Sequence, residues 1–173
     1  MNVNIIIIAL TLFSNAAMSA ESIGKNNSTP SQPVFGLIER AILTPGELPL
    51  DVKMDTGALT SSLDARNIEV FNKNGVNWVR FDIETIDGKS NNIITTFERK
   101  IIRTVKIRGA GGSDERKAVL LNICIGHQSS EEQFTLRDRS EMKFPVIIGR
   151  RTIEHLGLID VKRKFTVEPK CVN

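Results

Sequence analysis

The chain has 173 residues, of which 40% are hydrophobic and 25% are charged. These values fit a single globular domain and exclude a wholly disordered chain, a collagen-like repeat and a polytopic membrane protein. The formal net charge of +3 is too small to indicate a polyanionic ligand, so we expect no nucleic acid among the partners.

Residues 1–20 are predicted to be an export signal. An apolar run at residues 5–13 is followed by small residues that end at Ala20, a pattern typical of a cleavable signal peptide. The run is about half as long as the roughly 20 residues needed to cross a bilayer, and an uncleaved anchor is the alternative. We expect an exported protein, periplasmic or secreted, with no membrane attachment after signal cleavage.

The rest of the chain divides into a leader and one domain. Residues 21–33 are polar and rich in Ser, Asn and Pro, which predicts a flexible leader. From residue 34 to residue 173, short segments rich in Val, Ile, Thr and Phe alternate with turn signals. Only residues 150–157 have a helical pattern, which ends at Gly157. This pattern predicts an all-β domain, a barrel or a sandwich, with one short C-terminal helix.

One short motif is a candidate catalytic turn. Asp55, Thr56, Gly57 and Ala58 follow a predicted strand and lead into a second extended segment. We expect Asp55 at the tip of a tight turn, with the Thr56 hydroxyl locking the turn from beneath. Gly57 has no Cβ, so it would let a substrate backbone approach closely. Asp-Thr-Gly alone is also common in ordinary turns.

A second motif near the C-terminus strengthens this interpretation. An apolar strand at residues 144–148 ends in Gly149 and Arg150, where the predicted helix begins. The two motifs, in this order, resemble those of the retropepsin-like aspartic proteases, the single-lobe relatives of pepsin. The runs KMDTGALTSSLDA, WVRFDIE and TLRDRSEMKFPVIIGRRTI are similar to the bacterial family labelled ATP-dependent zinc proteases, which belongs to the same group. The resemblance covers roughly residues 35–165 and implies a closed retropepsin-like β-barrel.

The resemblance also implies an activity. The chain would be an aspartic endopeptidase acting on a peptide or protein substrate, with Asp55 as the catalytic residue, supported by residues 56–58, Gly149 and Arg150. Such hydrolysis needs two carboxylates about 3 Å apart that share one proton. Because the chain contains a single Asp-Thr-Gly, we expect a homodimer that contributes Asp55 twice. The alternative is a non-proteolytic accessory module of the same fold that binds a peptide or a cell-wall partner.

The substrate cleft is assigned by the same resemblance. Leu59 and Thr60 would line it next to the catalytic turn. A covering flap is expected as a β-hairpin between the two motifs, and our candidate turns at Asp87 and Gly88. The loop at residues 109–113 is the second candidate for the flap.

Two positions depart from the pattern of the family. Viral retropepsins have an Asp at the position of Leu59, where it pairs with the arginine of the Gly-Arg motif. We therefore expect Arg150 to form a buried pair with another carboxylate, either Asp51, Asp64 or Asp160, or else to contact a substrate. A solvated arginine at the start of the helix is the alternative. Family members often have His at the position of Asp64, and this difference favours the non-proteolytic alternative.

The family label names ATP and zinc, which the sequence does not support. Neither the phosphate-binding pattern G-x-x-x-x-G-K-[ST] nor the zinc pattern H-E-x-x-H occurs in the chain. The candidate zinc ligands are scattered: Cys124, His127, His155 and Cys171. We expect no cofactor and no metal. In an oxidising compartment Cys124 and Cys171 could form one disulfide, or Cys171 could pair between subunits.

Overall fold

The computed structural model describes residues 32–86, 90–109 and 112–171. The predicted export signal, nearly all of the predicted leader, and the candidate flap residues Asp87 and Gly88 lie outside the described residues.

Strands make up most of the described chain. The elements are, in chain order, β1 (Val34–Thr44), β2 (Leu48–Met54), β3 (Ser61–Asp64), β4 (Arg66–Lys73), β5 (Val76–Ile86), β6 (Asn92–Lys100), β7 (Arg103–Gly109), β8 (Gly112–Ile125), β9 (Gln128–Arg137), β10 (Val146–Ile148), α1 (Arg150–Leu156) and β11 (Leu158–Lys164). The predicted all-β class with one short C-terminal helix is therefore confirmed.

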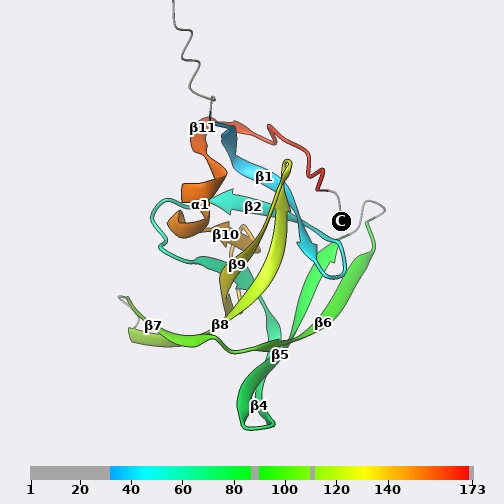
Figure 1. Cartoon of the computed structure of the whole chain (residues 1–173), viewed down its shortest axis with the longest axis vertical. Coiled ribbons are helices and arrows are strands. Elements are labelled where there is room, and N and C mark those ends of the chain that lie inside the picture. The colour runs from blue at the N-terminus through cyan, green and yellow to red at the C-terminus, as the bar shows by residue number, and fades with distance from the viewer. Residues whose placement is uncertain (1–31, 87–89, 110–111, 172–173) are drawn as a thin grey trace, which may run out of the picture. The chain divides into compact units, whose positions relative to one another are not determined.

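Six of the strands close into a barrel. Backbone hydrogen bonds join them in the order β1, β2, β10, β3, β9 and β8, and β8 pairs back with β1. Figure 1 shows these strands around one centre, with α1 beside β10. β11 extends the sheet at β1, and β7 extends it at β8. Of the two architectures that the sequence pattern left open, the barrel is the correct one.

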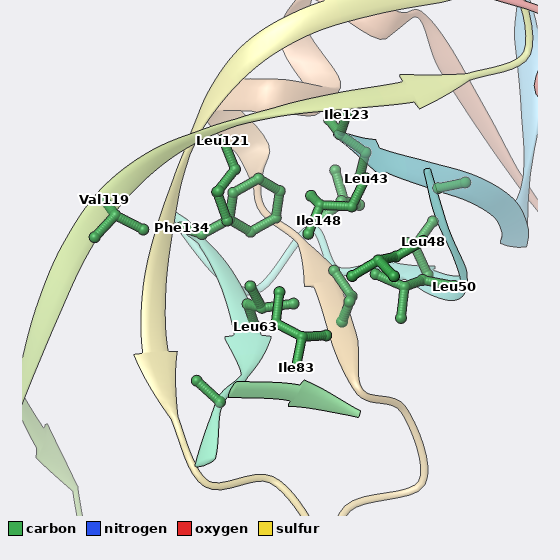
Figure 2. Packing of buried hydrophobic residues seen from close by; sticks show 14 of the residues in the cluster. Leu43, Leu48, Leu50, Leu63, Ile83, Val119, Leu121, Ile123, Phe134 and Ile148 are labelled. Atoms are coloured by element: carbon green, nitrogen blue, oxygen red, sulfur yellow. The ribbon is translucent and has the colours of Figure 1, made fainter. Parts of the chain in front are cut away.

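The hydrophobic core fills this barrel and explains where the site lies. Along β2 every second side chain, from Leu48 to Met54, is buried, as expected for a strand with one face in the core. Figure 2 shows side chains from other strands, among them Leu63, Phe134 and Ile148, converging on the same interior. Burial of each such side chain stabilises the fold by roughly 1.5–3 kcal/mol. Since Met54 is the last core residue of β2, the next residue emerges from the barrel at a fixed place.

A separate antiparallel sheet of β4, β5 and β6 packs against the barrel. Phe81 and Phe97 are both buried, and their rings stack with centroids 5.6 Å apart. The Thr85 hydroxyl donates to the carbonyl oxygen of Pro49, near the beginning of β2. At about 3.3 Å per residue, the two ends of β2 lie about 20 Å apart. This sheet therefore contacts β2 at the end remote from the candidate catalytic turn.

Helix α1 ends where the sequence predicts. Gly157 has a φ of 145°, which favours glycine, and its N–H donates to the carbonyl oxygen of Ile153 at 3.1 Å. A Cβ at this position would lie 2.2 Å from the carbonyl oxygen of Pro33. In the part of the chain that the structure describes, no helix is long and apolar enough to cross a membrane.

Candidate active site

The candidate catalytic turn begins at the end of β2, next to the end of a parallel strand. β10 runs beside β2, with Ile148 opposite Met54. The N–H of Asp55 continues this pairing by donating to the carbonyl oxygen of Ile148 at 2.8 Å. The chain then turns back, and the N–H of Ala58 donates to the carbonyl oxygen of Asp55 at 3.1 Å. The two sequence motifs are thus adjacent in space and fix the start of the turn together.

The Asp55 carboxylate is half-buried and oriented by its own turn. The N–H of Gly57 donates to Oδ1 of Asp55 at 3.0 Å. Thr56 and Gly57 are exposed, so the open side of the carboxylate can be reached from outside. Thr56 contributes its carbonyl oxygen to the contacts around the turn, and the locking role of its hydroxyl stays a prediction. A carboxylate with one oxygen held and one side open can activate a water molecule if a second acid is supplied.

Gly149 allows the C-terminal motif to cross directly over the turn. A Cβ at this position would lie 2.6 Å from the carbonyl carbon of Thr60 and 2.9 Å from the backbone nitrogen of Ser61. No side chain fits at that separation, so the glycine is required by close backbone approach. The N–H of Gly149 is also used, because it donates to Oγ of Ser61 at 3.0 Å.

Arg150 is exposed and clasps the turn through backbone oxygens. Its Nη1 donates to the carbonyl oxygen of Thr56 at 2.8 Å and reaches that of Gly57 at 3.3 Å. Its backbone N–H donates to the carbonyl oxygen of Ala58 at 2.9 Å. The expectation of a buried pair between Arg150 and a carboxylate was wrong. At the first residue of an exposed helix, the side chain extends back over the turn instead.

The three carboxylates proposed as partners of Arg150 have other surroundings. Asp64 faces Arg66, whose Nη2 lies 3.0 Å from Oδ2, and accepts the N–H of Arg139 at 2.6 Å. Asp160 accepts the N–H of Lys162 within its own strand. Asp51 is exposed on β2. Asp64 therefore joins the end of β3 to the segment that contains Arg139.

Arg139 is a buried cation near the site that was not among the predicted site residues. Burial lowers its pKa, and the nearby Arg116 and Arg137 lower the pKa further. The negative charges of Asp64 and Asp55 act in the opposite direction and raise it. Nε of Arg139 also donates to the carbonyl oxygen of Phe144, at the start of the C-terminal motif. No local pattern in the sequence indicates these contacts, since they join segments far apart in the chain.

The predicted cleft residues lie next to the turn. Leu59 is 50% exposed. Thr60 accepts a hydrogen bond from Nη2 of Arg103 at 3.1 Å, so the base of the β7–β8 hairpin reaches the segment after the candidate catalytic turn. The role of either residue in binding substrate stays a prediction.

Two hairpins are candidates for the flap. The tip of the β5–β6 hairpin, with Asp87 and Gly88, lies outside the described residues, and Thr85 on this hairpin contacts the remote end of β2. β7 begins at Arg103 beside the site and pairs with β8 as far as Gly109 and Gly112, and residues 110–111 of the second candidate loop lie outside the described residues. The contact geometry favours this second candidate, and the assignment of a flap stays a prediction.

Cys124 and Cys171 are joined by a disulfide within the chain, with their Cα atoms 6.0 Å apart. This is one of the two pairings that the sequence left open. Across the described ranges, His, Cys, Asp and Glu form no group of three or more that could hold a metal ion.

Comparison with known proteins places these features in a family. The family model RimB-like, described as retropepsin-like aspartic endopeptidase RimB, matches residues 34–170. Two proteins named "Probable alpha-L-glutamate ligase" are similar to this chain. The protein from Shewanella pealeana is 30% identical over 122 residues, which are 70% of this chain and 26% of that protein. The protein from Shewanella halifaxensis is 31% identical over 117 residues, which are 67% of this chain and 25% of that protein.

The chain therefore spans about a quarter of the length of these ligase-named relatives. A solved structure is also similar, that of Lpg0085 from Legionella pneumophila, a protein described as of unknown function. The TM-score is 0.68 at 32% sequence identity, over 80% of this chain and 100% of that one.

Proposed function

Because the chain belongs to the RimB-like family of retropepsin-like aspartic endopeptidases, we propose that it hydrolyses peptide bonds through two Asp55 carboxylates, one from each subunit of a homodimer. The observation that carries this proposal is the position of Asp55. Its carboxylate stands on a turn fixed by Ile148 and by the N–H of Gly57, with its other side open.

The chemistry requires the second subunit. One carboxylate of the pair takes a proton from water, while the protonated partner donates to the scissile carbonyl oxygen, so the two must share one proton. Asp64 is committed to Arg66 and to the N–H of Arg139, and it does not stand on the catalytic turn. A second Asp55, related by a two-fold axis, supplies the missing acid.

Exposed apolar groups are available for such a dimer. Leu59 lies beside the turn and is half exposed. β11 is the edge of the eight-stranded sheet, and it exposes Leu158 and Val161 by 55% and 66%. Edge strands with exposed apolar side chains are suited to pairing with another chain. These surfaces support the proposal, and the two-fold arrangement is to be measured.

We also propose that the protein is exported. The predicted signal at residues 1–20 is the first argument, and the disulfide between Cys124 and Cys171 is an independent one, since disulfides persist mainly in oxidising compartments. Cell fractionation and the N-terminal sequence of the recovered protein test this. Recovery of an uncleaved chain from the reducing cytosol would contradict it.

The substrate is proposed at the level of peptides and proteins. A degenerate peptide library, supplemented with glutamyl peptides because relatives with a matching segment are named as glutamate ligases, is the appropriate panel. Wild-type protein is expected to cleave members of this panel at mildly acidic pH. Asp55→Asn is expected to lower kcat/KM by at least about 1,000-fold while the unfolding curve stays the same, because the residue is half-buried and its substitute is isosteric.

A mixing experiment tests whether the dyad is shared. Wild-type and Asp55→Asn protein are mixed at constant total concentration and allowed to exchange subunits. If only dimers with two intact Asp55 residues are active, an equal mixture retains roughly a quarter of the activity of wild type. If each chain acts alone, it retains roughly half. A protein that is monomeric in sedimentation and cleaves nothing would instead favour the non-proteolytic binding module.

A further inference from the structure

A buried carboxylate lies behind the catalytic turn. Glu132, on β9, has a side chain only 8% exposed. Its Oε2 accepts a hydrogen bond from the Thr152 hydroxyl at 2.8 Å, and its Oε1 accepts one from the Ser130 hydroxyl at 2.8 Å. Nε2 of His155 lies 3.2 Å from Oε1. A buried carboxylate is costly unless it is hydrogen-bonded, so these donors hold Glu132 in one orientation.

The hydrogen bonds continue from Glu132 toward the active site. Oγ1 of Thr152, on α1, lies 3.2 Å from Oγ of Ser61, at the start of β3. Oγ of Ser61 in turn accepts the N–H of Gly149 at 3.0 Å. The side chains of Glu132, Thr152 and Ser61 are all buried. The carboxylate is thus joined to the Gly-Arg motif by two hydroxyl groups that bulk water does not reach.

Each hydroxyl has one proton, and this fixes which group donates in each hydrogen bond of the series from Glu132 to Gly149. The Thr152 hydroxyl has a single proton, and it donates this proton in the hydrogen bond to Oε2 of Glu132. Thr152 must then accept from Ser61, so the Ser61 proton points to Thr152. The Ser61 oxygen is left free to accept the N–H of Gly149. The acceptor oxygen of Glu132 therefore orders every hydrogen bond up to Gly149, and hydrogen bonds in such a series polarise one another.

We propose that Glu132 is a positioning residue for the catalytic turn, acting through Thr152 and Ser61 on Gly149. Gly149 directly precedes Arg150, which donates from its backbone and its guanidinium to carbonyl oxygens of the turn. The ordered hydrogen bonds fix the backbone position from which Arg150 donates to the turn that carries Asp55. The expected effect on catalysis rests on the proposed peptidase activity, whereas the ordering of the hydrogen bonds from Glu132 to Gly149 does not.

The test removes one link at a time. Thr152→Val keeps the shape of the side chain but removes the hydroxyl that links Glu132 to Ser61, whereas Thr152→Ser keeps that hydroxyl. Ser130→Ala is the matched control: it removes a donor from Oε1, on the side that does not lead to Gly149, and Oε1 keeps its contact with His155, so Glu132 keeps its orientation. We expect Thr152→Val to lower kcat about tenfold with KM changed less than twofold. Thr152→Ser and Ser130→Ala are expected to stay within about twofold of wild type.

A readout that does not depend on activity is the amide resonance of Gly149 in ¹⁵N-labelled protein. Thr152→Val and Ser61→Ala are expected to shift it, and Ser130→Ala is expected to leave it in place. If Thr152→Val leaves both kcat and the Gly149 resonance at the wild-type values, or changes them no more than Ser130→Ala does, the proposal is overturned. If wild type cleaves no peptide but the resonance shifts as described, the peptidase proposal fails and the ordering of the chain is supported.

Discussion

The guanidinium of Arg150 donates to the carbonyl oxygen of Thr56 at 2.8 Å, across 94 positions of sequence. A carbonyl oxygen points toward Arg150 only while the backbone of the turn keeps its present conformation. This hydrogen bond therefore stabilises the backbone conformation of the turn, in addition to holding the turn close to α1. Asp55 precedes Thr56 directly, so the orientation of its carboxylate depends on the same backbone.

Arg150→Ala is accordingly expected to lower kcat/KM by about 10- to 100-fold, since a small displacement of the reacting carboxylate can cost that much. The free energy of unfolding should fall by less than about 1 kcal/mol, because the side chain is exposed and screened by solvent. Peptide cleavage and urea unfolding measure the two effects. Arg151→Ala, at the exposed arginine next along the helix, is the control. Equal losses of activity in both variants would contradict this role for Arg150.

Two glycines of the site are expected to fail in different ways when a methyl group is added. Gly149→Ala would place Cβ 2.6 Å from the backbone of Thr60, where neither segment can yield, and should destabilise the fold by about 1–3 kcal/mol. The nearest atom to a Cβ at Gly57 is Oδ1 of Asp55, at 3.2 Å. Gly57→Ala should therefore keep the stability of wild type but displace the carboxylate and lower kcat by about tenfold.

Urea unfolding and initial cleavage rates separate the two variants. The idea of a close backbone crossing at Gly149 would be wrong if Gly149→Ala unfolded at the wild-type midpoint. Wild-type turnover by Gly57→Ala would show that the Asp55 carboxylate does not need its present position.

Local pattern was sufficient to predict the all-β class, the helix and the turn that carries Asp55. The alternation along β2 and the stop at Gly157 are set by neighbours in sequence, and both occur in the structure as expected. The resemblance to retropepsin-like proteases rested on two short motifs, and the match of the family model to residues 34–170 confirms it. Parallel pairing of β2 and β10 brings those motifs together.

Contacts between segments that lie far apart in the chain could not be predicted from the sequence. Arg150 was expected to need a carboxylate, yet backbone oxygens of the turn satisfy it, and no residue type encodes that choice. The chain from Glu132 to Gly149 depends on β3 pairing with β9 and on α1 lying against β3. Hydroxyl residues such as Ser61 and Thr152 are common in strands and helices, so their alignment can be recognised only in three dimensions.

Acid stability matters for an enzyme assayed at low pH, and Asp82 contributes to it. Asn67 donates to its carboxylate at 2.7 Å and Thr96 at 2.6 Å, and these hydrogen bonds lower the pKa of Asp82. A carboxyl group whose folded pKa is lowered adds stability above its unfolded pKa of about 4, and this stability is lost as pH falls through the folded pKa. Asp82→Asn should therefore flatten the fall in unfolding free energy below about pH 4.

Urea unfolding at a series of pH values from about 5 to 2 measures this slope. Thr96→Val keeps the carboxyl group but removes one donor, so its slope should lie between those of wild type and Asp82→Asn. Identical slopes in wild type and Asp82→Asn would exclude a contribution from this group.

The disulfide should stabilise the fold without taking part in the chemistry. Cys124 and Cys171 are separated by 47 positions, and closing a loop of that length restricts the unfolded chain by about 4 kcal/mol in the chain-entropy model. We expect a reductant to lower the free energy of unfolding by about 2–4 kcal/mol. The double variant Cys124→Ser/Cys171→Ser should be equally destabilised and should not respond to reductant. Cleavage measured well below the unfolding transition should change less than twofold, because the bonds that hold Asp55 come from Ile148 and Gly57. Loss of activity in fully folded, reduced protein would show instead that the C-terminal segment acts on the site.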